Sequence, residues 1–222
     1  TQTALELIEK YQLKGKLCHY SAGEGLPMIK KAKARGIPVT CEVTPQHLYY
    51  SQEQLEEKER GFFQMNPPIR FEHDREAMLE AAGRGDVDYL ATDHAPHSLE
   101  EKRRGTSGLT GLDSYGAFVT WLLENQKFTP ERIALMTAEN PGTFANQFLP
   151  SIAPLSLAHK RLGQGVGFLK KGYAGHVTVL NRRSPWTLEV PHLKTKVGHN
   201  PFVGVKFPGR VEQVFLYGKA AL

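Results

Sequence analysis

The first ninety residues alternate between amphipathic helical segments and short apolar segments rich in β-branched residues. Hydrophobic spacing predicts helices over 1–11, 25–36, 51–60 and 74–85, and strands over 16–21, 37–44 and 87–93. Antiparallel strands can be joined by a tight turn, whereas parallel strands need a long crossover, which is usually a helix. Strands separated by helices therefore predict parallel βαβ units and an α/β fold.

The remainder of the chain has a different pattern. A helical region is predicted over 113–147, with one break near Thr129-Pro130, where threonine can cap a new helix, and another at Asn140-Pro141. Residues 151–165 predict a loop. Short strands separated by glycine and proline are then predicted over 177–180, 186–190, 202–207 and 211–218. We place the domain boundary between 149 and 150, with a small β-sandwich-type domain over 150–222.

The composition excludes several classes of partner. The net charge is only +5, and the cations form scattered pairs without interleaved aromatic residues, so we expect no nucleic-acid surface. No apolar stretch is long enough to span a bilayer, so we expect no membrane partner and a cytoplasmic location. Cys18 and Cys41 lie in strand-like segments and are expected to be buried free thiols.

Polar side chains follow each of the three predicted parallel strands. His19 follows the first strand, Glu42 to His47 follow the second, and Asp93 and His97 follow the third. Asn66 precedes two prolines that stiffen its loop. Sites in parallel α/β folds lie at the carboxyl ends of the strands, so these side chains are expected to converge there. Histidine, aspartate and a fixed asparagine suit a divalent metal with substrate-orienting donors.

Each of these residues also has an ordinary structural explanation. A single histidine at a strand end, such as His19, is commonly a satisfied polar residue, and Asp93 can cap the turn after its strand. His47 can pack against a neighbouring strand, while His94 and His97 flank a proline and can face solvent. Only the convergence of these side chains at strand ends makes a metal site an equal alternative.

Several blocks of the sequence resemble, in order and spacing, the C-terminal half of a dihydroorotase. This is a family of metal-dependent cyclic amidohydrolases built on a (β/α)8 TIM-like barrel. The blocks are HYS (19–21), VTCEVTPQHL (39–48), NPPIR (66–70), ATDHAPHSLEEK (91–102) and GLTGLDS (108–114). The resemblance implies that residues 1–149 supply about the last three barrel strands, and that the tail is the small antiparallel β-domain flanking the barrel. Gln46 and Gly175-His176 depart from the family pattern without touching an implied ligand.

The resemblance also implies roles for individual residues. His19 would bind one zinc ion of a binuclear centre, and Asp93 would bind the other and act as the catalytic general acid and base. Glu42 and His47 would support the site. The substrate-binding residues would be Asn66, His97, Ser107 and Gly108. The implied reaction is the reversible cyclisation of N-carbamoyl-L-aspartate to L-dihydroorotate in de novo pyrimidine biosynthesis, with these small molecules as substrates.

One part of the family pattern is missing. The family's first barrel strand carries a His-x-His-x-Arg motif, which occurs nowhere in these 222 residues. Three strands cannot close an eight-stranded barrel, and two ligands are too few for a tight binuclear site. We therefore expect this chain to be a C-terminal piece of a dihydroorotase that is inactive by itself.

Two alternatives remain open at this stage. The chain can belong to another cyclic amidohydrolase, such as an allantoinase or a hydantoinase. It can also be a non-catalytic dihydroorotase-like scaffold for aspartate transcarbamoylase; a homodimer is a further assembly that the sequence leaves open. The presence of His19, Asn66, Asp93 and His97 argues against the scaffold, because a scaffold has no chemical need for them.

Overall fold

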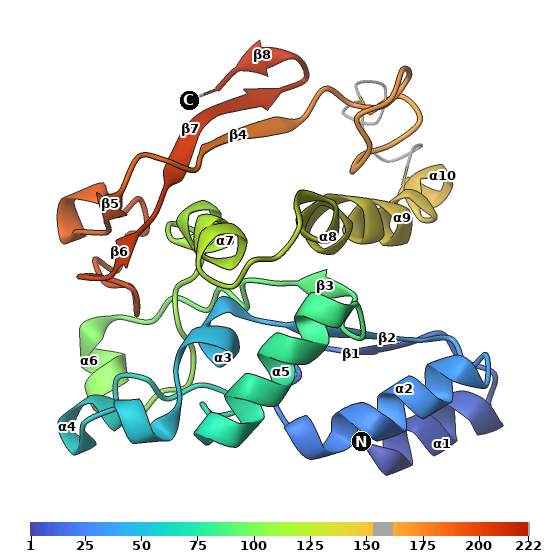
Figure 1. Ribbon diagram of the computed structural model, residues 1–222, viewed down its shortest axis with the longest axis horizontal. Coiled ribbons are helices and arrows are strands. Elements are labelled where there is room, and N and C mark those ends of the chain that lie inside the picture. Colours follow the sequence, from blue (N-terminus) through green and yellow to red (C-terminus); the bar gives the residue numbers. More distant parts are fainter. Residues whose placement is uncertain (153–161, 222) are drawn as a thin grey trace. The chain divides into compact units, whose positions relative to one another are not determined.

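The computed structural model describes residues 1–152 and 162–221, which divide into two compact units (Figure 1). The first unit comprises Thr1–Tyr115 and Glu189–Val203, and the second comprises Gly116–Leu188 and Gly204–Leu222. All residues predicted to bind metal or substrate lie in the first unit. The domain boundary predicted between 149 and 150 stays a prediction.

The first unit is built on a three-stranded parallel sheet, as the α/β prediction required. Its strands are β1 (Gly15–Leu17), β2 (Val39–Val43) and β3 (Tyr89–Leu90), in the order β1-β2-β3. The central strand β2 is almost wholly buried, which is typical of a parallel sheet covered on both faces. The outer strands are shorter than predicted, because the chain leaves the ladder before it reaches His19 and Asp93.

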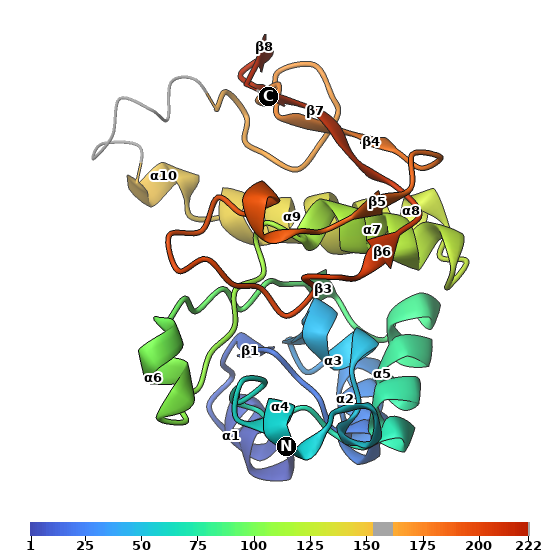
Figure 2. The ribbon, with the colours of Figure 1, turned by 90° about the vertical axis from the view of Figure 1, so that its left-hand side faces the viewer.

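Three amphipathic helices of this unit match the prediction closely: α1 (Gln2–Lys10), α2 (Leu26–Ala34) and α5 (Glu72–Arg84). Helices α1 and α2 lie on the same side of the sheet in both views (Figures 1 and 2). They pack on β1 and β2 through a cluster that includes Leu5, Ile8 and Val39. Helix α5 ends at Gly85, whose φ of 99° gives the left-handed cap that favours glycine.

Residues 51–60 form two short elements instead of the predicted single helix. These are η2 (Gln52–Gln54) and α4 (Glu57–Arg60), which extended backbone at Leu55 and Glu56 separates. Two further one-turn helices, α3 (Pro45–Tyr49) and α6 (Leu99–Arg103), and the 3-10 turn η1 (Gly23–Gly25) were not predicted. Both helices are too short to show hydrophobic periodicity, and each is capped by a side chain: the hydroxyls of Thr44 and Ser98 each accept a hydrogen bond from the main chain of the third residue of their helix.

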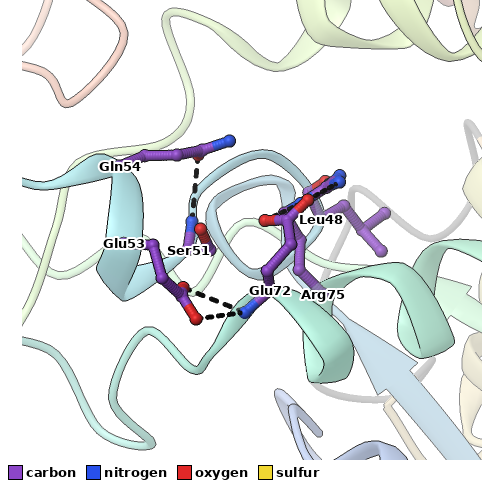
Figure 3. A network of polar contacts seen from close by, with 6 residues as sticks. All are labelled: Leu48, Ser51, Glu53, Gln54, Glu72 and Arg75. Atoms are coloured by element: carbon purple, nitrogen blue, oxygen red, sulfur yellow. Dashed lines mark hydrogen bonds and ion pairs between the residues drawn. The ribbon is translucent and has the colours of Figure 1, made fainter.

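A polar network ties the end of α3 to the beginning of α5 (Figure 3). Both carboxylate oxygens of Glu53 accept hydrogen bonds from the main-chain nitrogen of Glu72, at 3.2 and 3.0 Å. Arg75 pairs with the Glu72 carboxylate and donates to the carbonyl oxygen of Leu48 at 3.3 Å. The main-chain nitrogen of Ser51 donates a hydrogen bond of 3.1 Å to the side-chain oxygen of Gln54 beside them. The network fixes the ends of the segment that carries Asn66.

The helical region of the second unit comprises α7 (Tyr115–Glu124), α8 (Pro130–Ala134), α9 (Asn140–Asn146) and α10 (Leu149–Ile152). The predicted break near Thr129 is confirmed, since its hydroxyl caps α8 by accepting from the main chain of Arg132. The predicted break at Asn140-Pro141 is wrong. A π-helical turn, η3 (Leu135–Glu139), leads straight into α9, so the helix continues through Asn140-Pro141, and the wider turn just before Pro141 accommodates the residue that lacks an N–H. No helix in the described part of the chain is long and apolar enough to cross a membrane.

The strands of the second unit are antiparallel, as predicted. Strand β7 (Arg210–Leu216) pairs with both β4 (Val177–Asn181) and β8 (Lys219–Ala220), and β5 (Trp186–Thr187) pairs with β6 (Lys206–Phe207). The predicted strand over 202–207 is reduced to β6, because the residues before it form a turn. The short helix η6 (Val190–His192) belongs to the first unit. Most of the predicted loop over 151–165 lies outside the described residues.

Both cysteines are free thiols, but they differ in exposure. Cys41 lies in β2 and is fully buried, as predicted. The prediction that Cys18 is buried is wrong, because β1 ends at Leu17 and Cys18 lies beyond it on the surface.

Candidate functional site

The two predicted metal ligands share an unusual backbone conformation. His19 and Asp93 follow β1 and β3, and both have positive φ angles, of 37° and 45°. The other described non-glycine residues with positive φ, Gln12, Lys127 and Tyr217, are exposed residues of turns and loops. His19 and Asp93 are partly buried, and strained backbone at such positions is held by surrounding structure and concentrates at functional sites.

Glu42 of β2 holds the backbone around His19. Its Oε1 accepts a hydrogen bond of 3.0 Å from the main-chain nitrogen of His19, and its Oε2 pairs with Nζ of Lys16. The ring nitrogen Nδ1 of His19 is buried and has no hydrogen-bond partner. Burying a polar atom without a hydrogen-bond partner costs about 1–3 kcal/mol of folding free energy. An unpartnered ring nitrogen of this kind is therefore suited to bind a ligand from outside the chain, such as a metal ion.

Asp93 lies within electrostatic range of the same cluster. Burial raises the pKa of its carboxyl, the imidazole of His19 opposes that rise, and the carboxylate of Glu42 adds to it. A carboxyl whose pKa is raised by burial holds a proton more readily than an exposed carboxyl does. The environment of Asp93 therefore suits a group that takes up a proton and returns it.

His19 and Asp93 fit a metal only as part of a ligand set. Among residues 1–152 and 162–221, no three histidine, cysteine, aspartate or glutamate side chains are grouped closely enough to hold an ion. Catalytic zinc sites use at least three protein ligands. The donor chemistry of the pair matches zinc, and a zinc site built on it would need further ligands from outside the described residues.

His47 supports the loop that carries Asn66. Its Nε2 donates a hydrogen bond of 3.0 Å to the carbonyl oxygen of Pro67, and its Nδ1 accepts one of 2.8 Å from the hydroxyl of Thr44. The ring is almost completely buried, and burial lowers the pKa of His47 to about 4. His47 is therefore neutral at pH 7 and fixes the peptide beside Asn66.

The structure brings His97 and Gly108 into direct contact. Gly108 has a φ of 133°, and a Cβ atom there would lie 2.8 Å from both Cδ2 of His97 and Cβ of Ala95. Its main-chain nitrogen donates to the carbonyl oxygen of Gln64 at 3.0 Å, and the Gln64 amide approaches Oγ of Ser107 at 3.5 Å. Three of the four predicted substrate-binding residues are thus joined to the segment that leads to the fourth, Asn66.

The ring of His94 stabilises the loop after β3. Its Nδ1 accepts hydrogen bonds from the main-chain nitrogens of Gly111, at 3.1 Å, and Leu112, at 3.4 Å. The main chain of Ala95 donates to the carbonyl oxygen of Leu109 in the same loop. These contacts place the 108–114 block beside the 91–102 block.

Two residues beside the site have no signal in the sequence that singles them out. His199 is 6% exposed, and its Nε2 donates a hydrogen bond of 2.7 Å to the carbonyl oxygen of His97. Lys102 is 2% exposed and donates to three carbonyl groups. Nothing in the local pattern around His199 indicates a contact with a residue 102 positions away. Lys102 lies within the 91–102 block, but lysine in a polar helix ordinarily faces solvent.

A cavity of about 500 Å³ also lies in the first unit, beside α4 and the 189–203 segment. Aromatic side chains, among them Tyr50, Phe62 and Phe63, line it together with His199. None of the predicted metal- or substrate-binding residues lines this cavity, although His199, which contacts the main chain of His97, does.

No family model matches the chain. It is 29% identical over 227 residues to a dihydroorotase of Lactobacillus acidophilus, a match that covers 99% of this chain and 49% of the relative. It is 32% identical over 208 residues to a dihydroorotase of Bacillus cytotoxicus, covering 91% of this chain and 44% of the relative.

Solved structures give the same result for the fold. An L-hydantoinase (dihydropyrimidinase) from Arthrobacter aurescens matches with a TM-score of 0.83 and 22% identity, over 99% of this chain and 47% of that one. A dihydropyrimidinase from Brevibacillus agri matches with a TM-score of 0.80 and 18% identity, over 99% and 47%. These cyclic amidohydrolases are TIM-barrel enzymes, and the chain matches them as a fragment. The chain spans about half the length of the curated relatives that it matches. Over nearly all of its residues it is a homologue of the dihydroorotases, in the cyclic amidohydrolase superfamily.

Proposed function

We propose that this chain forms part of a dihydroorotase, which interconverts N-carbamoyl-L-aspartate and L-dihydroorotate in pyrimidine biosynthesis. One observation carries the proposal: the unpartnered Nδ1 of His19 and the carboxyl of Asp93 lie in one electrostatic cluster at the ends of parallel strands. They do so in a chain that is 29–32% identical to curated dihydroorotases. The chain by itself supplies too few ligands for a binuclear site, so we expect it to be inactive alone.

The chemistry would be divided between the protein and zinc. A zinc ion held partly by His19 and Asp93 would activate water and polarise the ring carbonyl group of the substrate. Asp93 would accept the proton of the attacking water and return it to the ring nitrogen, which is a poor leaving group as an anion. Glu42 would keep His19 in position through the hydrogen bond to its main chain.

The substrate would be oriented by the loops between and after the strands. The Asn66 amide, the His97 imidazole and the backbone near Ser107 supply donors and acceptors that match the carboxylate and cyclic amide of dihydroorotate. Gly108 would allow the His97 ring to lie against the main chain, because a Cβ atom at this position would collide with the ring. The hydrogen bond from His47 to Pro67 would hold the Asn66 loop in place.

The test supplies the other half of the enzyme. The chain is fused to the part of the Lactobacillus acidophilus dihydroorotase that it does not match, and we call this fusion the completed protein. We expect the completed protein, loaded with zinc, to interconvert dihydroorotate and carbamoyl-aspartate, and the chain alone with zinc to show no turnover. Turnover of dihydroorotate by the chain alone would refute the expected inactivity.

A second candidate is a hydantoinase, because the matching solved structures are hydantoinases and dihydropyrimidinases. The completed protein is therefore assayed with dihydroorotate, hydantoin, dihydrouracil and allantoin. Faster turnover of any of the last three would replace the proposed substrate. A folded, zinc-loaded protein that turns over none of the four would favour the scaffold, and copurification with aspartate transcarbamoylase would then be measured.

A further inference from the structure

Lys102 is a buried lysine in the one-turn helix α6. Its side chain is almost inaccessible to solvent, and Nζ donates hydrogen bonds of 2.8 Å to the carbonyl oxygens of Gln64, Thr106 and Gly108. An ammonium group has three N–H donors, so all of them are used. Burial lowers the pKa of Lys102 to about 8, which leaves the group protonated at pH 7.

The three acceptors belong to separate parts of the chain. Thr106 and Gly108 lie just after α6, whereas Gln64 lies 38 residues before Lys102. A lysine that merely capped its own helix would not reach the earlier segment. The same two segments are also joined directly, because the main chain of Gly108 donates to the carbonyl oxygen of Gln64.

These acceptors surround the proposed substrate-binding residues. Gln64 lies two residues before Asn66, and Thr106 and Gly108 flank Ser107 on both sides. The helix that carries Lys102 begins directly after its cap Ser98, which follows His97. One ammonium group therefore joins the segment that leads to Asn66 to the segment that carries Ser107.

We infer that Lys102 is a positioning residue of the proposed site, which holds the segments bearing Asn66 and Ser107 together for substrate binding without touching the substrate. The inference rests on the proposed function for its effect on the substrate. The geometric part, the coupling of the two segments, concerns this chain alone and can be tested without activity.

The first measurement is amide hydrogen exchange on the chain at pH 7, comparing the unmodified chain with Lys102→Met. Methionine has a similar length and no donor, so the 64–66 and 105–109 segments should exchange about tenfold faster or more. The amide of Cys41, bonded to Asp88 in the sheet, should keep its rate. Arg103→Met, an exposed position on the same helix, is the matched control and should change neither segment.

Faster exchange that includes Cys41 to the same extent would mean general destabilisation, and unchanged exchange in both segments would mean no coupling; either result overturns the inference. If Lys102→Met does not fold, Lys102→Gln, which keeps two of the three N–H donors on a shorter side chain, should make the same two segments exchange faster by a smaller factor.

The second measurement uses the completed protein. Lys102→Met should raise KM for dihydroorotate about tenfold or more, with a smaller change in kcat and an unchanged zinc content, and Arg103→Met should change none of these. A fall in kcat with KM unchanged would overturn the positioning role. If the unmutated completed protein does not turn over dihydroorotate, the proposed function fails, while the exchange measurement still decides whether Lys102 couples the segments.

Discussion

The main-chain nitrogen of His19 donates a hydrogen bond of 3.0 Å to Oε1 of Glu42, which joins the end of β1 to the central strand β2. Glu42 is 6% exposed and also pairs with Lys16. The buried carboxylate thus holds a strained histidine backbone, with φ of 37°, in place while the ring nitrogen Nδ1 stays without a protein partner.

Replacing Glu42 with leucine should destabilise the chain by about 1–3 kcal/mol, because the main chain of His19 loses its acceptor and Lys16 loses its counter-ion. Urea unfolding at pH 7 measures this loss. Glu42→Gln keeps an acceptor oxygen for His19 and should be less destabilising. Equal losses for the two variants would mean that the ion pair with Lys16, and not the bond to His19, is what matters.

The neutral state of His47 should make stability depend on pH. Burial lowers the folded-state pKa to about 4, whereas an unfolded histidine titrates near 6.5, so the unfolded chain binds more protons between these values. The contribution of His47 is therefore complete above about pH 6.5 and is lost as the pH falls to about 4, up to about 3 kcal/mol in all. Urea unfolding at pH 7, 5.5 and 4.5 should show a steeper decline for the unmodified chain than for His47→Gln. Parallel curves would contradict the assignment.

Adding a methyl group at Gly108 should disturb the contact with His97. The φ of 133° and the 2.8 Å approach to His97 and Ala95 predict that Gly108→Ala costs about 1–3 kcal/mol and displaces the His97 ring. Gly105 is the matched control, because it also has a positive φ, of 81°, but no neighbouring atom within 4 Å of the place that a Cβ would take. Gly105→Ala should cost only about 1 kcal/mol. Thermal unfolding of both variants measures the two losses of stability. An equal loss for Gly105→Ala and Gly108→Ala would contradict the role of the contact with His97.

The carboxylate of Glu53 should stabilise α5 in a pH-dependent way. Hydrogen bonds from its own main-chain N–H and from that of Glu72 lower its pKa (Figure 3). A lowered pKa means that the stabilisation is present above the ordinary value for glutamate and is lost as the pH falls through the folded-state value. Glu53→Gln should lower the melting temperature at pH 7 and make no difference at pH 2.5. A difference of equal size at both pH values would show that the charge of Glu53 does not contribute.

Replacing Asp93 should affect stability and activity in opposite directions. Burial raises its pKa, so the ionised carboxylate is disfavoured in the fold, and asparagine tolerates the left-handed backbone at this position well. Asp93→Asn should therefore unfold at an equal or higher urea concentration, yet reduce turnover by the completed protein about 10²–10⁴-fold. Loss of activity accompanied by unfolding would leave Asp93 with a structural role instead.

The local pattern of the sequence was enough to predict the scaffold of the site. Apolar residues at helical spacing identified α1, α2 and α5, and the β-branched run identified β2. These elements are stabilised by burying an apolar face, and the spacing of apolar residues in the sequence marks that face. The same pattern placed His19 and Asp93 at the carboxyl ends of parallel strands. It failed where local features compete: Pro141 predicted a break, and a π-helical turn absorbs it.

The tertiary structure alone decided which residues hold the site together. The hydrogen bonds from Lys102 to Gln64 and from His199 to His97 join positions 38 and 102 residues apart, and no periodicity encodes such a pairing. A buried ammonium group needs acceptors for its N–H donors, and the three carbonyl groups around Lys102 converge only after the chain has folded. The sequence by itself therefore determined which elements form and which polar residues end the strands. Folding determined how those residues are held, because hydrogen bonds between distant segments depend on positions that only the packed chain defines.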